Sequence, residues 1–297
     1  MAKRECGAVR EMKKIFLFRD YPFAIGIPAI IFQMLFFYLP LAILVVGSFI
    51  AFGEEGRLQG FTLEKLLFFM RAPYFKVIGY SLLLASGNAL LCFLIAYPLA
   101  YYLAFRGKRI KNILLFLLIV PFWTNFLLHV YAWFFVLERQ GFLNIFLQKL
   151  GLIHEPIAFL NSLFSVMVMM VYYYLPFMVL PIYSSLEKFD TRLIEASYDL
   201  GASWRQTMKK VLLPLSSRSI KTGFFLVYIP SFGEFAIPEL MGGDRQMFVG
   251  SVVAHYILGD TTGSLGAAFT LISCCALIIS ATIWFKLIDY LLKRCVK

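Results

Sequence analysis

The sequence predicts an all-α membrane protein with six transmembrane helices. Hydrophobic residues make up 61% of its 297 residues and charged residues 15%, and the mean hydropathy is +0.79. The core of a soluble domain of this length cannot bury so much apolar surface. The apolar residues are gathered into runs of about 20, which is the length that a helix needs to cross the hydrocarbon core of a bilayer.

Six such runs are predicted as spans in chain order. They are 24–52, 77–105, 113–137, 163–183, 220–237 and 265–288. The first run follows a basic segment, 1–23, as in a signal peptide, but it is too long and lacks a small-residue cleavage site. Membrane helices tolerate proline where neighbours satisfy the freed carbonyls, so Pro28 and Pro40 do not exclude a span. A short outer helix is expected at Phe142 to Leu150.

The domain organisation follows from these spans. We expect a cytoplasmic basic N-terminus at 1–23, a first transmembrane helix at 24–52, a five-helix transmembrane domain at 77–288 and a cytoplasmic tail at 289–297. Most of the 28 Lys and Arg residues lie in the N-terminus, in the connections after the second and fourth spans, and in the C-terminus. The positive-inside rule therefore places both termini in the cytoplasm.

Composition and motifs exclude several function classes. The net charge of +11 is spread over all inner connections, so topology explains it and no nucleic-acid partner is expected. The five cysteines and three histidines show no metal-ligand spacing, and no cofactor is expected. No G-x-x-x-x-G-K-[ST] sequence occurs, so the chain is not itself an ATPase. A membrane enzyme is also disfavoured, because no catalytic residues converge in the sequence.

The connection between the fourth and fifth spans contains a motif of defined register, within about 187–214. Glu195-Ala196-Ser197 is followed by three residues, Gly201, nine residues and then Val211-Leu212-Leu213-Pro214. A short amphipathic helix is expected to begin near Asp190 as its N-cap and to end at Gly201. Ser203 and Gln206 have the spacing of a capping box that opens a second helix. An amphipathic helix lying on lipid would explain the polarity but not this register.

This motif resembles the EAA loop of permease subunits of ATP-binding-cassette importers, with Ser197 and Val211 in place of the usual Ala and Ile. The segments 114–125, 175–190 and 229–243 are similar to PotB-type permeases of spermidine and putrescine importers, and the resemblance covers most of the chain from about Gly79. It implies a type I importer with the MetI-like permease fold in the bacterial inner membrane. It also implies ATPase-coupling roles for Glu195, Ala196, Asp199, Gly201, Ala202 and Pro214.

The resemblance implies partners as well. They are a second, PotC-like permease, a PotA-like ATPase dimer that hydrolyses ATP, a soluble PotD-like polyamine-binding protein and membrane lipid. The chain itself would move a small cation by alternating access without covalent chemistry. An importer of ferric iron or of an oxyanion remains an alternative, because related permeases share the EAA pattern. A secondary transporter or channel fits six spans but gives no reason for the Glu195-to-Pro214 register.

Glu234 is the candidate residue for the substrate pathway. It lies roughly 21 Å along the fifth span, inside the hydrocarbon core, and Pro230, Gly233 and Pro238 are expected to break the helix around it. Because a carboxylate there costs about 2.5 to 3.5 kcal/mol on insertion scales, it needs a partner or a wet pathway. A polyamine ammonium is one such partner, and the alternative is a Lys, Arg or backbone amide. Aromatic residues that could add cation–π contacts are Phe232, Phe235, Trp123 and the run Tyr172 to Tyr174, centred on Tyr173.

Two acidic residues lie beyond the fifth span. Glu239 and Asp244 follow Glu234 in the outer connection. Because charged groups at a protein surface steer association with a partner, these two carboxylates are interpreted as candidates for docking the soluble binding protein.

Overall fold

The computed structural model describes residues 22–52, 58–107, 110–243, 247–259 and 263–294. Almost all of the predicted basic segment 1–23 lies outside the described residues, as do Asp244 and residues 295–297 of the predicted tail. The chain divides into two compact units, residues 1–65 and 66–297.

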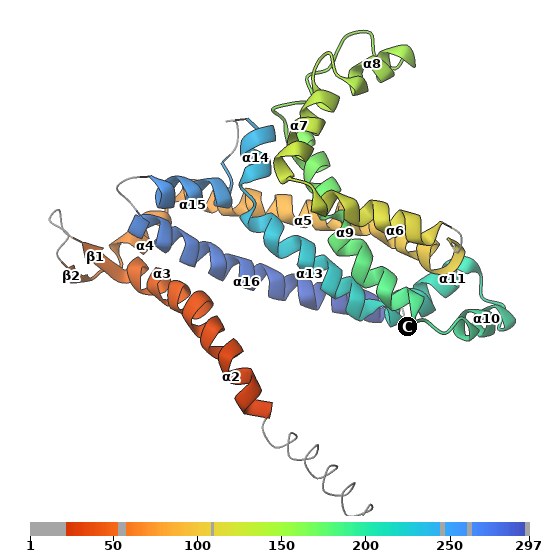
Figure 1. The fold of residues 1–297 in the computed structure, drawn as a ribbon, viewed down its shortest axis with the longest axis horizontal. Coiled ribbons are helices and arrows are strands. Elements are labelled where there is room, and N and C mark those ends of the chain that lie inside the picture. The colour runs from red at the N-terminus through yellow and green to blue at the C-terminus, as the bar shows by residue number, and fades with distance from the viewer. Residues whose placement is uncertain (1–21, 53–57, 108–109, 244–246, 260–262, 295–297) are drawn as a thin grey trace, which may run out of the picture. The chain divides into compact units, whose positions relative to one another are not determined.

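The N-terminal unit contains one long helix and a β-hairpin (Figure 1). The helix runs through α2 (Pro22–Gln33), the π-helical turn η2 (Met34–Tyr38) and α3 (Leu39–Phe49), and includes Pro28. The hairpin pairs β1 (Ile50–Phe52) with β2 (Leu58–Phe61) in antiparallel register. The prediction of an all-α protein missed this hairpin, because strands of three and four residues are too short to show a period-two pattern.

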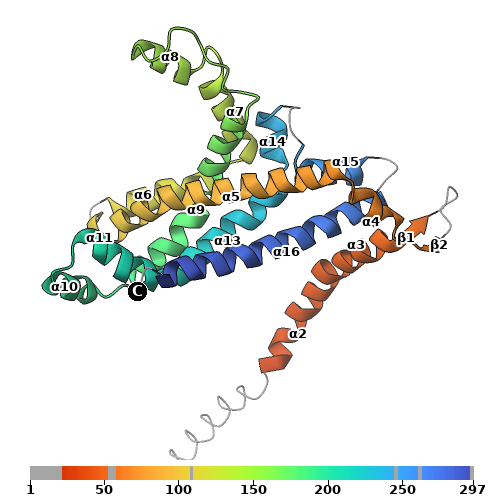
Figure 2. The same cartoon turned by 180° about the vertical axis from the view of Figure 1, so that it is seen from behind.

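The second unit is helical (Figure 2). Its long helices are α5 (Ala72–Tyr101), which continues as the π-helical turn η3 (Tyr102–Arg106), α9 (Leu163–Glu187), α13 (Ser217–Gly233) and α16 (Gly263–Arg294). The shorter elements are α6 (Lys111–Ile119) with the 3₁₀ turn η4 (Val120–Trp123), α7 (Phe126–Leu137), α8 (Phe142–Lys149), α10 (Arg192–Asp199), α11 (Trp204–Thr207) with η5 (Met208–Leu212), α12 (Leu213–Leu215), α14 (Ala236–Met241) and α15 (Val249–Leu258). One further helix, α4 (Glu64–Phe69), lies at the boundary of the two units.

The core of the second unit is formed by α5, α9 and α13, which pack against one another. Small residues permit this close approach, as is usual between membrane helices. A Cβ atom added at Gly223 of α13 would lie 2.9 Å from the Sδ atom of Met178 in α9. Buried polar side chains join the same helices, because the Asn88 amide of α5 donates to the Ser231 hydroxyl of α13 at 2.7 Å.

Four described helices are long and apolar enough to cross a membrane, and a fifth span results if one bent pair is counted. That pair corrects the third prediction, because the segment 113–137 is not one continuous helix. Residues 111–123 and 126–149 meet at an angle of 105°. Thr124 is extended, and the Asn125 side chain accepts the Leu127 N–H at 2.9 Å, which starts a new helix after the break.

Two further differences concern the last third of the chain. The predicted fifth span, 220–237, is interrupted because α13 ends at Gly233, although Pro230 lies inside α13 without ending it. α15 occupies the connection between the fifth and sixth spans, for which no element is expected from the sequence. Its ten residues are too few for a spanning run, so hydropathy over long windows overlooks it. The short helix predicted at Phe142 to Leu150 is confirmed by α8.

Candidate functional site

The connection between α9 and α13 forms two short helices that meet at Gly201. The Gly201 N–H donates to the Tyr198 carbonyl at 2.8 Å and the Ala202 N–H to the Ser197 carbonyl at 3.0 Å, which together make a complete Schellman motif. Gly201 has a φ of +78°, in the left-handed region that favours glycine. The predicted helix end at Gly201 is confirmed. The predicted N-cap is displaced by one residue to Thr191, although the Asp190 carboxylate accepts the Arg192 N–H.

The second short helix begins as predicted. The Ser203 N–H donates to the Gln206 side chain at 2.7 Å, and the two residues form a capping box. The helix then widens to a π-helical turn over Met208–Leu212 before Pro214. The Ser197 hydroxyl lies 2.8 Å from that of Thr207 and joins α10 to α11. Ser197, the residue that departs from the usual EAA pattern, is therefore buried with a partner across the loop.

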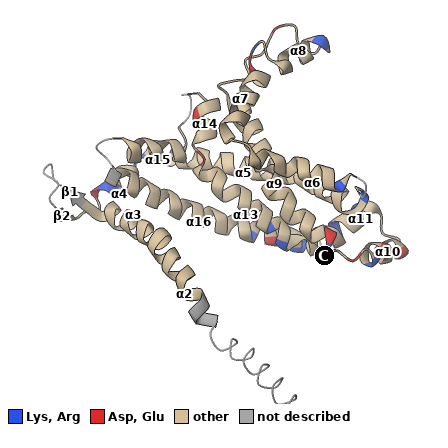
Figure 3. Ribbon diagram, viewed as in Figure 1, with Lys and Arg blue, Asp and Glu red and all other residues tan. Residues whose placement is uncertain are grey.

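The surface of this loop is exposed and mixed in character. Glu195, Ala196 and Asp199 are exposed on α10, and so are several apolar side chains, of which Leu200 is 88% exposed. Charged residues gather at this end of the second unit, near α10, α11 and the last turns of α16 (Figure 3). Exposed apolar residues rimmed by charges are typical of a surface that binds another protein.

A second site lies where α13 gives way to α14. Glu234 is in an extended conformation between the two helices. Its Oε2 atom accepts a hydrogen bond of 2.6 Å from the Tyr174 hydroxyl of α9. Its Oε1 atom accepts the Ala236 N–H at 3.1 Å and the Ile237 N–H at 3.5 Å. The carboxylate therefore caps the start of α14, where free amide groups favour a negative charge.

Neighbouring helices hold this break from three sides. A Cβ atom added at Gly250 of α15 would lie 2.5 Å from the Gly233 carbonyl oxygen and 2.8 Å from that of Glu234. The Ser81 hydroxyl of α5 accepts the Val249 N–H at the start of α15. The Ser165 hydroxyl of α9 donates to the Met241 carbonyl at the end of α14, at 2.8 Å. The break is thus a packed feature of the fold.

The comparisons with known proteins identify the family. A family model described as "Binding-protein-dependent transport system inner membrane component" matches residues 96–294. The chain belongs to this family. The spermidine/putrescine transport system permease protein PotB of Escherichia coli (strain K12) is 39% identical over 236 residues, which cover 79% of this chain and 86% of that protein. The chain is accordingly a multi-pass membrane protein and a transport subunit, not an enzyme.

Two solved structures share the fold. A crystal structure of a bacterial ABC transporter involved in the import of the acidic polysaccharide alginate matches with a TM-score of 0.70 at 15% identity, over 98% of this chain and 99% of that one. The alginate transporter in complex with its alginate pentasaccharide-bound periplasmic protein matches with a TM-score of 0.68 at 14% identity, over 97% and 98% of the two chains. At these identities the similarity concerns the fold alone.

The permease fold brings together only some of the residues proposed for the pathway. Phe232 is buried and lies two positions before Glu234 in the chain. Trp123, in contrast, is 75% exposed and packs on Phe116, with ring centroids 6.0 Å apart. Tyr173 packs between Phe122 and Phe126, whereas the adjacent Tyr174 binds Glu234. The predicted run was centred on Tyr173, but adjacent residues of a helix point in different directions, and the hydroxyl that reaches Glu234 is that of Tyr174.

Proposed function

We propose that the chain is the permease subunit of an ATP-driven importer of spermidine and putrescine, and that it forms the pathway with a second homologous permease. The family and the name of the 39% identical relative support this proposal. The alginate transporter with its periplasmic protein supports a soluble binding protein as a further partner. The PotC-like, PotA-like and PotD-like identities of the partners belong to the same proposal.

The proposed topology has six crossings, with both termini in the cytoplasm of a bacterial cell and the chain in the inner membrane. Segment 1–23 is then a cytoplasmic N-terminus, 24–52 the first crossing, 77–288 the transmembrane domain and 289–297 the tail. The bent pair of helices 111–149 counts as one crossing, and α13 with α14 as another. The excess of Lys and Arg in the inner connections supports this orientation.

Coupling to ATP hydrolysis is assigned in this proposal to the α10–α11 loop, which would dock the ATPase dimer. The proposed contacts are Glu195, Ala196, Asp199, Gly201, Ala202 and Pro214. The exposure of the first three supports the assignment, because side chains on α10 are open to a partner. Gly201 and Ala202 would act by shaping the loop, since both donate backbone hydrogen bonds that end α10.

The observation that carries the proposed substrate is the incomplete neutralisation of Glu234. Three hydrogen-bond donors reach its carboxylate, but no Lys or Arg pairs with it among the described residues. Two carboxylate oxygens offer about four acceptor positions, so one position on Oε2 remains for a further donor. An ammonium group would supply both that hydrogen bond and the missing positive charge. The Ala236 and Ile237 N–H groups are the backbone partners that a structural role predicts, and the uptake of a Glu234 variant distinguishes the two roles.

Radiolabelled spermidine uptake into proteoliposomes that contain all subunits tests the proposal. Glu234→Gln keeps the size of the side chain and removes its charge, so uptake per assembled complex is expected to fall about tenfold or more, because hydrogen bonds to charged groups contribute about 1.5–3 kcal/mol. Glu155→Gln, which removes an exposed carboxylate between α8 and α9, is the matched control and should leave uptake unchanged. Unchanged uptake in Glu234→Gln would exclude the pathway role. Loss of assembly would show that the carboxylate is structural.

A further inference from the structure

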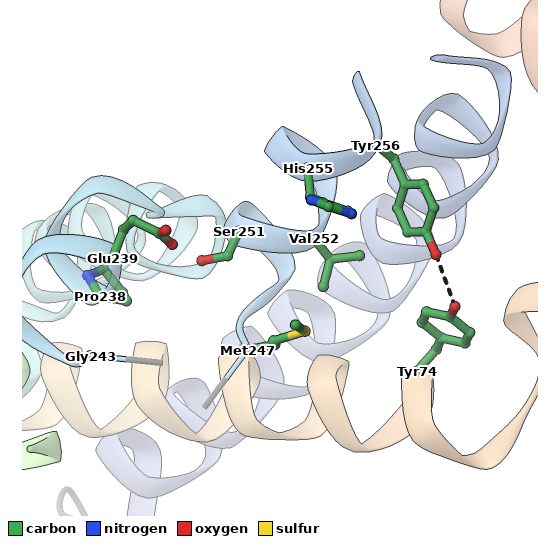
Figure 4. Close-up of a pocket in the computed structure, with 9 residues that line it drawn as sticks. All are labelled: Tyr74, Pro238, Glu239, Gly243, Met247, Ser251, Val252, His255 and Tyr256. Atoms are coloured by element: carbon green, nitrogen blue, oxygen red, sulfur yellow. Dashed lines mark hydrogen bonds between the residues drawn. The ribbon is translucent and has the colours of Figure 1, made fainter. Parts of the chain in front are cut away.

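A cavity of about 410 Å³ lies between α14, α15 and the start of α5. It is distinct from the Glu234 break, although α14 borders both. Its lining includes Tyr74, Glu239, Met247, Ser251, His255 and Tyr256 (Figure 4). The cavity lies at the opposite end of the second unit from α10 and α11 (Figure 1). In the proposed topology it therefore opens on the outer side, and its size is within the range of small-molecule sites.

Three polar side chains of this cavity have no partner within the described part of the chain. The side chains of Glu239, Ser251 and His255 make no hydrogen bond or ion pair there, and no described Lys or Arg lines the cavity. Figure 4 shows the Ser251 hydroxyl directed toward the side that carries Glu239. A carboxylate, a hydroxyl and an imidazole thus border one hollow, and none of the three side chains is paired with another described residue.

The wall opposite Glu239 is aromatic and well supported. The Tyr74 and Tyr256 hydroxyls lie 3.0 Å apart and bind each other (Figure 4). Both rings pack on the buried Phe69, with centroid distances of 4.6 Å for Tyr74 and 5.5 Å for Tyr256. α14 is fixed in turn, because the Ser165 hydroxyl of α9 donates to the Met241 carbonyl at the end of α14. The cavity has a negative side and an aromatic side, and packing holds both in place.

We propose that this cavity is an outer capture site for one primary ammonium group of an aliphatic diamine or polyamine, with Glu239 as its counter-ion. An ammonium group has three donors and no acceptor, so the Glu239 carboxylate and the Ser251 hydroxyl, which lie on the same side of the cavity in Figure 4, can each accept one of them. The choice of an amine as ligand rests on the proposed function. The capture site goes beyond the proposed function, because it makes Glu239 a residue that contacts the substrate as well as a surface charge.

Cysteine protection in the assembled permease–ATPase complex tests this site. Met247 lines the cavity and is 68% exposed, so Met247→Cys in a background free of native cysteines reports access by N-ethylmaleimide. Putrescine is expected to slow the labelling at least fivefold, whereas 1,4-butanediol, its uncharged analogue, should have no effect at matched ionic strength. Adding Glu239→Gln should abolish protection, and adding Glu155→Gln should preserve it. Equal labelling with and without putrescine, or full protection in Glu239→Gln, would overturn the proposal.

Spermidine uptake by the same variants, in proteoliposomes that contain all subunits, separates the two proposals. Uptake without protection at position 247 rejects the capture site and leaves the proposed importer intact. Protection by putrescine without uptake of any polyamine keeps an ammonium site at Glu239 and rejects the proposed transport function. Complex yield after Glu239→Gln shows that the variant folds, which is expected because Glu239 is exposed.

Discussion

The α10–α11 loop and the Glu234 break both turn the chain sharply, but different contacts hold them. In the loop, the side-chain hydrogen bond between Ser197 and Thr207 joins residues ten positions apart. The hydrogen bonds of the Schellman motif join residues that are closer still along the chain. At the break, Tyr174 binds Glu234 across 60 positions, and Ser81 binds the Val249 N–H across 168. The hydrogen bonds that shape the loop are therefore local, whereas those at the break come in part from neighbouring helices.

This difference has a mechanical consequence. Hydrogen bonds between residues close in sequence do not depend on where the surrounding helices lie. The loop can therefore keep its shape when those helices move, and it can transmit their movement as a rigid element. The Glu234 break depends on α5, α9 and α15 together, so any shift among these helices changes the position of its carboxylate. In a transporter that works by alternating access, the first property suits a docking element and the second suits a site whose affinity must change.

The largest expected effect is at the break. In Gly250→Ala the new methyl group would lie 2.5 Å from the Gly233 carbonyl oxygen, a backbone atom that cannot easily move. Overpacking of this kind costs about 1–3 kcal/mol, and we expect a clear fall in the unfolding midpoint of the purified complex and in uptake. Gly79→Ala in α5 is the matched control, because no atom lies within 4 Å of its added Cβ. Equal midpoints for the two variants would refute the tight packing described for the break.

A smaller and more selective effect is expected in the loop. Gly201→Val places a β-branched residue at a φ of +78°, which costs roughly 1–2 kcal/mol and should weaken ATPase co-purification about 5- to 30-fold while membrane insertion remains intact. Gly151→Val is the matched control, because Gly151 has a φ of +70° and no atom within 4 Å, but follows α8. If both variants lose the ATPase equally, the effect is general strain and the docking assignment fails.

The smallest effect concerns the bond that joins α10 to α11. Ser197 and Thr207 each have a second acceptor, the carbonyls of Ile194 and Ser203, so loss of one hydroxyl leaves no group unpaired. A double-mutant cycle with Ser197→Ala and Thr207→Ala, measured on the free energy of unfolding, should give a coupling energy of about 0.5–1.5 kcal/mol. The exposed Thr282 replaces Thr207 in the control cycle and should show additivity. A zero coupling energy for the first cycle would mean that the bond contributes nothing to the loop.

The sequence predicts local features well where neighbouring residues decide the geometry. Gly201 ends a helix because a left-handed residue is needed there, and Ser203 with Gln206 opens the next helix, so both could be inferred from spacing alone. Long apolar runs likewise predicted the helices around 24–52, 163–183 and 265–288, because burial in lipid requires length and composition. The choice of Glu234 also came from the sequence, since a carboxylate within an apolar run needs a specific environment.

Tertiary structure alone decided which residues meet. Tyr174, and not Tyr173, binds Glu234 because of how α9 faces α14, and α15 lies against the break because Gly250 permits the contact. The 105° bend after Trp123 and the cavity at Glu239 also depend on packing between distant segments. Hydropathy and spacing describe a residue through its neighbours in the chain. The partners of a buried polar group come from other helices, and only the packed fold selects them.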